Sequence, residues 1–139
     1  MKTKSSLVGG YQSVINNGRN HTVVTDLPTE SNGEDFGATA LELAVMSLAG
    51  CISTIYKKVA DKMRIDVANL EVELDAEKGE DTINKVKCVV NVTSDATQEK
   101  LEKCLDNTMK ACPVGVLYEK AGVEISTELI RQAQYMNAD

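Results

Sequence analysis

The sequence predicts a single α+β domain over residues 1–139, with elements in the order β-β-α-β-β-α-β. Three observations support this class. One long apolar segment begins with a helix-capping signal, two strand-like stretches follow it around a glycine turn, and a shorter segment near the C-terminus has helical apolar spacing. With 139 residues the chain can bury one core, and with no Trp and a single Phe that core must be aliphatic.

The first third of the chain predicts a β-hairpin followed by a loop. Residues 5–16 and 20–27 have strand composition and flank the turn Asn-Asn-Gly-Arg, where Asn-Gly supplies the positive φ that a tight hairpin needs. Residues 28–37 are rich in Pro, Gly, Asn and acids, which is typical of a loop.

A long helix is predicted over residues 39–62. Thr39 with Glu42 three residues later forms the pattern of a capping box. Residues 36–56 then contain one charge in 21, close to the ~20 residues that span a bilayer. The interspersed Ser and Thr residues, and the lack of a flanking aromatic belt, favour a helix buried on all sides instead. A chain of this size achieves that burial as the central helix of a homodimer.

Two strands are predicted next, over residues 67–76 and 82–93, joined by a glycine turn. In the second strand apolar and polar residues alternate, which places Cys88 on the buried face. We therefore interpret Cys88 as a core residue.

The C-terminal part predicts a helix over residues 96–111 with Ser94 or Thr97 as its cap. Its apolar residues recur at helical spacing and include Cys104, which also reads as core. Pro113 ends this helix, because the residue before a proline is pushed out of helical geometry. A short helical turn to Gly122, a last strand over residues 123–130 and a loose tail over 131–139 complete the prediction.

Composition narrows the chemistry available to the chain. A net charge of −6 without a basic cluster argues against nucleic acid as a partner. No secretion signal opens the chain, which predicts a cytoplasmic protein with reduced thiols. His21 is the only histidine and no C-x-x-C pair exists, so no metal site is expected. Phosphate- and dinucleotide-binding glycine motifs are absent as well. Any chemistry that the chain performs must therefore depend on thiols, carboxylates, Lys and Arg.

The segment "ALELAVMSLAGC" at residues 40–51, followed by "CPV" at 112–114, resembles the OsmC/Ohr family of osmotically inducible and organic hydroperoxide resistance proteins. The likeness covers essentially the whole chain in element order. It implies an intertwined homodimer, in which two long central helices are wrapped by antiparallel sheets. It also implies a thiol peroxidase for organic hydroperoxides that uses no cofactor and is recycled by an external dithiol. The interpretation of the long helix as a buried one predicts no membrane partner.

The resemblance also implies which residues act. Cys51 would attack the peroxide, Cys112 would resolve the product, and Arg19 and Glu42 would activate the attacking thiol. The family's proline two residues before the glutamate is Ala40 here, and Glu42 lies one residue later than in the better-defined hydroperoxidases.

Three of these residues also have an ordinary interpretation. Cys51 suits a packed core position, Glu42 suits a capping box, and Arg19 suits a solvated turn. Lys58 is a further candidate cation on the helix of Cys51. A second functional hypothesis follows, namely a binding protein whose dimer cleft holds a small thiol or acyl ligand lined by non-catalytic cysteines.

Overall fold

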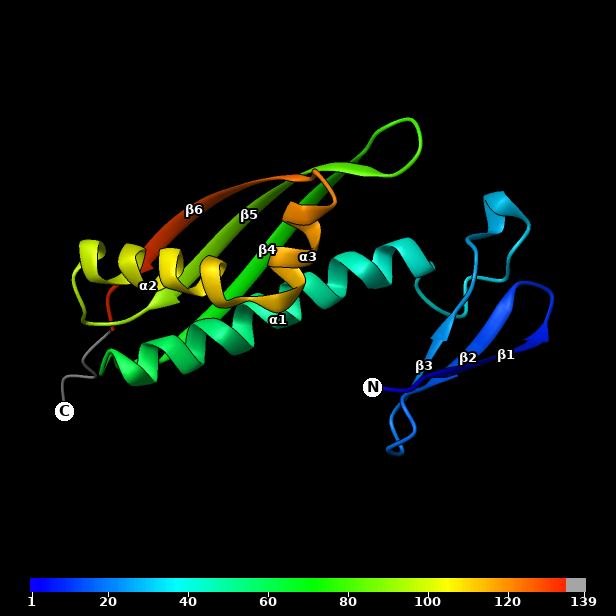
Figure 1. Cartoon of the computed structure of the whole chain (residues 1–139), viewed down its shortest axis with the longest axis horizontal. Helices are drawn as coiled ribbons and strands as arrows, with labels where there is room; N and C mark the ends of the chain where they lie inside the picture. The colour runs from blue at the N-terminus through cyan, green and yellow to red at the C-terminus, as the bar shows by residue number, and fades with distance from the viewer. Residues whose placement is uncertain (135–139) are drawn as a thin grey trace. The chain divides into compact units, whose positions relative to one another are not determined.

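The computed structural model describes residues 1–134 and contains two compact units, Met1–Met46 and Ser47–Asp139. Figure 1 shows a three-stranded sheet in the first unit, and a second three-stranded sheet with helices on one face in the other. The division falls within the long helix α1 (Ala40–Lys62). The α+β class predicted from the sequence is confirmed.

The N-terminal sheet has the order β1-β2-β3 and is antiparallel throughout. Its strands are β1 (Lys4–Gly9), β2 (Gln12–Asn16) and β3 (Thr22–Thr25). The prediction of one strand over 5–16 is wrong, because the chain reverses at Gly10, where φ is +52°. The hairpin around Asn-Gly is confirmed as the β2–β3 turn: Gly18 has φ +73°, and the Arg19 N–H donates to Asn17 Oδ1 at 2.9 Å.

Asp26 organises the loop that follows β3. Asp26 is only 4% exposed. Its carboxylate accepts hydrogen bonds from the backbone N–H groups of Leu27 at 2.7 Å, Glu34 at 3.3 Å and Phe36 at 3.2 Å. Burial alone would raise the pKa of this carboxyl, but the three N–H donors outweigh it and hold the pKa below its ordinary value. The loop contains a short 3-10 helix, η1 (Thr29–Ser31).

Removing the charge at Asp26 should loosen this loop. We expect Asp26→Asn to accelerate amide hydrogen exchange at Glu34 and Phe36, because a neutral amide is a weaker acceptor than a carboxylate. Since the folded-state pKa is lowered, the stabilisation is complete above the ordinary pKa of about 3.9 and is lost as pH falls through the lowered value. Wild-type exchange at these amides, measured against pH, should therefore approach that of the variant on acidification. Indistinguishable exchange at neutral pH would contradict the assignment.

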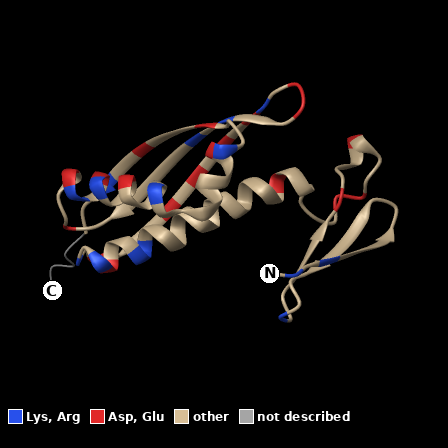
Figure 2. Cartoon of the chain, viewed as in Figure 1, with Lys and Arg blue, Asp and Glu red and all other residues tan. Residues whose placement is uncertain are grey.

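Helix α1 (Ala40–Lys62) begins with the predicted capping box. The Thr39 N–H donates to Glu42 Oε2 at 2.7 Å, and the Glu42 N–H donates to Thr39 Oγ1 at 3.1 Å. The residues of α1 buried within the chain form one stripe at intervals of four: Leu48, Ile52, Tyr56 and Ala60. Figure 2 shows the middle of the helix free of charge, with charged residues at its two ends.

The C-terminal sheet has the order β4-β5-β6, with β4 (Asn69–Lys78), β5 (Ile83–Thr93) and β6 (Glu124–Gln132). The pair β4–β5 is antiparallel and the pair β5–β6 is parallel, so the expectation of purely antiparallel sheets is wrong for this unit. The pairing is parallel because the two helices between β5 and β6 return the chain to the end of the sheet where β5 begins, so that β6 runs in the same direction as β5. Strand β6 also runs two residues beyond the predicted end, into the segment expected to be a loose tail; residues 135–139 lie outside the described part.

Two helices connect these strands. Helix α2 (Gln98–Ala111) starts at Thr97, whose hydroxyl accepts the Lys100 N–H at 3.3 Å, so Thr97 rather than Ser94 is the cap. Helix α3 (Pro113–Lys120) corresponds to the predicted short helical turn before Gly122. Proline interrupts the chain as expected, but it then occupies the first position of a new helix, where its fixed φ is favourable.

The main core lies in the C-terminal unit, between α1, α2 and the inner face of the sheet. Tyr56 donates its hydroxyl to the Leu101 carbonyl at 3.4 Å, which ties α1 to α2. The fully buried side chains of β5 alternate along the strand as predicted: Val86, Cys88, Val90 and Val92. This packing fixes the middle of α1 relative to the helices that follow β5.

Candidate functional site

Two cysteines 61 residues apart meet inside the C-terminal unit. Cys51 lies in the middle of α1, Cys112 lies between α2 and α3, and their Sγ atoms are 2.8 Å apart. A disulfide bond of ~2.05 Å would therefore need a movement of less than about 1 Å. Both thiols are free in this structure. The geometry allows reversible formation of a disulfide between them.

The position of Cys112 follows from its role at a helix start. It is the N-cap of α3, Pro113 takes the first helical position, and the Gly115 N–H donates to Cys112 Sγ at 3.3 Å. Its own N–H donates to the Thr108 carbonyl at 2.8 Å, which closes the end of α2. The end of α2 therefore fixes the backbone of Cys112, and the start of α3 fixes its sulfur atom.

The two thiols differ in their environment. Cys112 is 0% exposed, whereas Cys51 is partly exposed. Burial, together with the hydrogen bond that its S–H donates to Cys51, raises the pKa of Cys112 to about 11, against the lowering effect of the Gly115 N–H. Cys112 therefore keeps its proton at neutral pH and presents that proton to the sulfur of Cys51.

The other two cysteines are buried, as predicted. Cys104 on α2 donates weakly to the Tyr56 carbonyl at 3.8 Å, and burial raises its pKa. Burial raises the pKa of Cys88 to about 11, and negative charge on Cys112 contributes to that rise.

Replacing the buried thiols Cys88 and Cys104 should lower the stability of the protein without affecting the reactivity of Cys51 and Cys112. We expect Cys104→Ala and Cys88→Ala each to lower the free energy of unfolding by about 1 kcal/mol, through a small cavity. Denaturant titration measures that loss, and the folded variants should still form a disulfide between Cys51 and Cys112 when oxidised with diamide. Failure of a variant of normal stability to form this disulfide would show that a buried thiol takes part in its formation.

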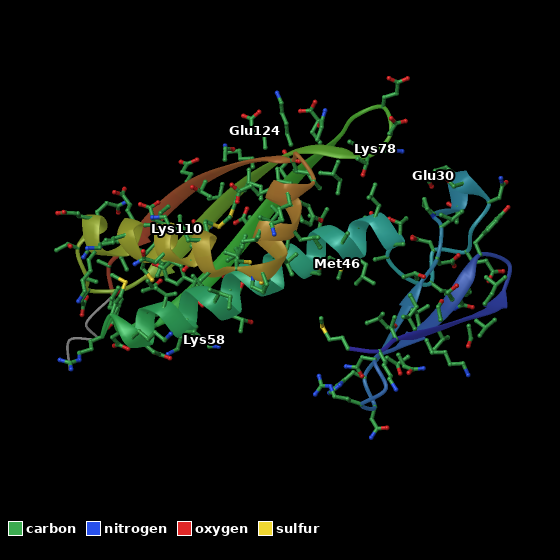
Figure 3. All side chains as sticks on the ribbon, viewed as in Figure 1. Glu30, Met46, Lys58, Lys78, Lys110 and Glu124 are labelled. Atoms are coloured by element: carbon green, nitrogen blue, oxygen red, sulfur yellow. The ribbon has the colours of Figure 1, made fainter. Side chains whose placement is uncertain are left out.

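The remaining predicted site residues are placed less directly. Glu42 makes the capping box described above, which accounts for its side chain. Arg19 is exposed in the β2–β3 turn of the N-terminal unit. Lys58 projects from the C-terminal half of α1, two turns beyond Cys51, and is exposed (Figure 3). The catalytic roles predicted for Arg19 and Glu42 stay predictions.

Sequence reasoning missed Gly115. Its N–H binds the Cys112 sulfur, and a Cβ at this position would lie 3.5 Å from that sulfur. The signal was present in Cys-Pro-Val-Gly, because an N-cap side chain receives the N–H of the third helical residue when proline occupies the first.

An open groove of about 590 Å³ lies beside α3, on the surface that includes Gly115. Figure 3 labels Lys110, on the last turn of α2, and Glu124, at the start of β6. The groove is lined by Asp106, Met109, Lys110, Gly115, Glu119, Val123, Ile125 and Thr127. Cys112 is not in its lining.

Two further features bear on the class of protein. Within residues 1–134, no group of three or more His, Cys, Asp or Glu side chains is arranged to hold a metal ion. Helix α1 is long and apolar enough to cross a membrane, a property that core helices of soluble proteins share.

Comparison with known proteins identifies the family. Residues 31–128 match the model of the OsmC-like protein family. No curated protein matches the chain in sequence. Among solved structures, an OsmC-like protein from Mycoplasma pneumoniae is similar with a TM-score of 0.83 and 13% identity, over 94% of this chain and 95% of that one.

Two further similar structures are connected with hydroperoxide resistance. One is the organic hydroperoxide resistance protein OhrB of Bacillus subtilis, with a TM-score of 0.66, 21% identity and coverage of 94% and 98%. The other is a Vibrio cholerae protein provisionally assigned to organic hydroperoxide resistance, with captopril bound in one of its active sites. Its TM-score is 0.70 at 13% identity, with coverage of 93% and 91%. With most of its length matching the family model and its fold shared with these structures, the chain belongs to the OsmC-like protein family.

Proposed function

We propose that this protein reduces organic hydroperoxides with Cys51 and Cys112 as a redox pair. The observation that carries the proposal is the 2.8 Å separation of the two sulfur atoms, one partly exposed and one fully buried. Membership of a family that includes hydroperoxide resistance proteins supports the same role.

The first step assigns Cys51 as the nucleophile. Its thiolate attacks the terminal oxygen of R–O–OH and breaks the O–O bond, leaving Cys51 as a sulfenic acid and releasing an alkoxide that takes a proton. Cys112 then attacks the Cys51 sulfur, and its thiol proton leaves with the hydroxyl as water. The result is a disulfide, which an external dithiol reduces by exchange.

The raised pKa of Cys112 gives this scheme a pH dependence. Below its pKa of about 11 the resolving thiol is mainly protonated, so condensation with the sulfenic acid should accelerate as pH rises. A steeper rise for the resolving step than for the peroxide step is therefore expected in stopped-flow measurements.

We also propose that the active form is a homodimer. Helix α1 buries one stripe of residues within the chain, while the opposite stripe, which includes Gly50 and Thr54, is exposed. From Met46 to Thr54 this exposed side carries no charge, and a second copy would cover it. A pocket bounded by two such helices would favour alkyl over inorganic peroxide, because it rewards burial of carbon. The cytoplasm, where dithiol reductants are kept reduced, is the compartment this chemistry requires.

Arg19 and Glu42 remain proposed activators of Cys51. If Arg19 promotes thiolate formation, Arg19→Ala should slow the peroxide step near neutral pH and recover at higher pH, where thiolate forms unaided. Glu42→Gln keeps most of the capping geometry, so a loss of rate without a loss of stability would indicate a role in activation. A deficit in Arg19→Ala that is the same at all pH values would remove Arg19 from the site.

Steady-state turnover tests the function. The protein is mixed with a dithiol and an excess of either an alkyl hydroperoxide or hydrogen peroxide, and peroxide consumption is followed. We expect many turnovers per protein, faster with the alkyl substrate. No turnover with either peroxide would favour the alternative of a small-molecule binding protein, which the captopril-bound relative suggests.

A further inference from the structure

The two sulfurs of the candidate pair are unequally accessible, which bears on how the disulfide is reduced. Cys112 is 0% exposed, enclosed by the end of α2 and the first turn of α3. Cys51 is partly exposed on α1. Thiol–disulfide exchange requires the incoming sulfur to approach the sulfur it attacks, so access selects the target.

The fully buried sulfur is also the one with a built site for negative charge. The Gly115 N–H donates to Cys112 Sγ at 3.3 Å, at the positive end of the α3 dipole. No side chain lies between this N–H and the sulfur, because residue 115 is a glycine and the sulfur belongs to the N-cap residue of the helix itself.

We propose that the external reductant attacks the sulfur of Cys51 and that Cys112 is the leaving group, received by the Gly115 N–H at the start of α3. This rests on the proposed redox pair. Gly115 is then a positioning residue for the reductive half of the cycle, acting through its backbone.

The electrons and atoms balance as follows. One thiolate of the dithiol forms a bond to Cys51 Sγ while the Cys51–Cys112 bond breaks, and the electron pair of that bond goes to Cys112. The Cys112 thiolate then takes a proton. The second thiol of the reductant attacks its own mixed disulfide, which releases Cys51 as a thiolate and the reductant as a cyclic disulfide.

One effect opposes this order. A thiol of high pKa is a poor leaving group, and the pKa of Cys112 is about 11. Attack on Cys112 would avoid that penalty, but it would require α3 to open, since the groove beside α3 reaches Gly115 without exposing the sulfur behind it. The hydrogen bond from the Gly115 N–H stabilises the departing Cys112 thiolate and so partly offsets its poor leaving ability. The accessibility of the two sulfurs therefore determines which of them the reductant attacks.

Mapping a trapped mixed disulfide tests the proposal. In a Cys88→Ala, Cys104→Ala background, the disulfide is formed with diamide, so that the test does not depend on peroxide chemistry. Glutathione is added, and the mixture is quenched with acid and an alkylating reagent at short times. Peptide mass spectrometry, extrapolated to zero time, should show glutathione on Cys51 and the alkyl label on Cys112 in at least ten-fold excess. Glutathione on Cys112 at the earliest times would overturn the proposal. If turnover with peroxide fails while this pattern holds, the proposed function fails and the reactivity order stands.

A matched pair of variants tests Gly115. Gly115→Ala and Gly115→Pro both add a Cβ, but only proline removes the N–H, and the first turn of a helix tolerates it. We expect Gly115→Pro to form the Cys51 mixed disulfide about ten-fold more slowly than Gly115→Ala, with the difference arising from the lost charge-assisted hydrogen bond. Circular dichroism establishes that both variants are folded, and the glutathione mapping stands without them. Equal rates in two folded variants would remove Gly115 from the reaction.

Discussion

Cys51→Ser should consume no organic hydroperoxide. A serine hydroxyl does not ionise near neutral pH and lacks the soft sulfur that attacks an O–O bond, so the reaction loses its nucleophile. The buried Cys112 cannot substitute, because its sulfur is 0% exposed and its pKa of about 11 keeps it protonated. Peroxide consumption, measured with dithiol present, should fall to that of a protein-free sample.

Cys112→Ser should fail differently. The attacking thiol remains, so one equivalent of hydroperoxide is consumed per chain and the reaction stops at a Cys51 sulfenic acid with no thiol beside it. A dimedone-type reagent should label Cys51 in this variant, and excess peroxide should convert it to sulfinic acid. Cys88→Ser, in which the altered residue is buried in β5 and is not one of the two sulfurs in contact, is the matched control and should turn over repeatedly. Identical single-turnover behaviour of the two site variants would mean that the roles are misassigned.

A folded monomer should not accumulate at micromolar concentration. One side of α1 is buried within the chain, at Leu48, Ile52 and Tyr56. On the other side, Met46 is 56% exposed and Gly50 faces open space. If a second copy covers this exposed side, its apolar surface leaves water on association.

Gly50→Glu tests the dimer where the two helices would meet. A carboxylate buried at such an interface without a partner costs several kcal/mol, enough to dissociate or unfold the protein. Lys103→Glu, on the exposed side of α2, changes charge without reaching that face and should leave assembly unchanged. Sedimentation equilibrium distinguishes the outcomes, and a wild type that sediments as a stable monomer would contradict the proposed dimer.

Local chemistry in the sequence predicted the local structure well. The capping box at Thr39 and Glu42 forms as expected, and the alternation along β5 places Cys88 inward. These features depend on residues within one element, so a single sequence contains enough information to predict them.

The failures concern how elements are joined. Gly10 splits the first predicted strand, but an isolated glycine in a strand-like run does not show whether the chain bends or reverses. A break at Pro113 and a helical turn as far as Gly122 are both predicted and both present, but the sequence does not show that Cys112 caps the new helix, and so it does not reveal the Gly115 N–H as a partner of the sulfur. The parallel pairing of β5 with β6 depends on the path of two helices, which strand composition does not encode.

The pairing of Cys51 with Cys112 is a contact across 61 residues. Periodicity suggested a buried role for any cysteine on an apolar helix, and only the resemblance to a family distinguished these two from Cys88 and Cys104. Their proximity arises from packing of α1 against α2 and from the cap of α3, none of which the spacing of the four cysteines reveals.

The most direct test of the redox pair is a stoichiometric oxidation. The reduced protein, with four free cysteines, is mixed with one equivalent of alkyl hydroperoxide per chain in the absence of dithiol, and its free thiols are counted before peptide mapping. We expect two thiols to be lost and one linked peptide joining Cys51 to Cys112. Four surviving thiols, or a disulfide that excludes either residue, would contradict the account.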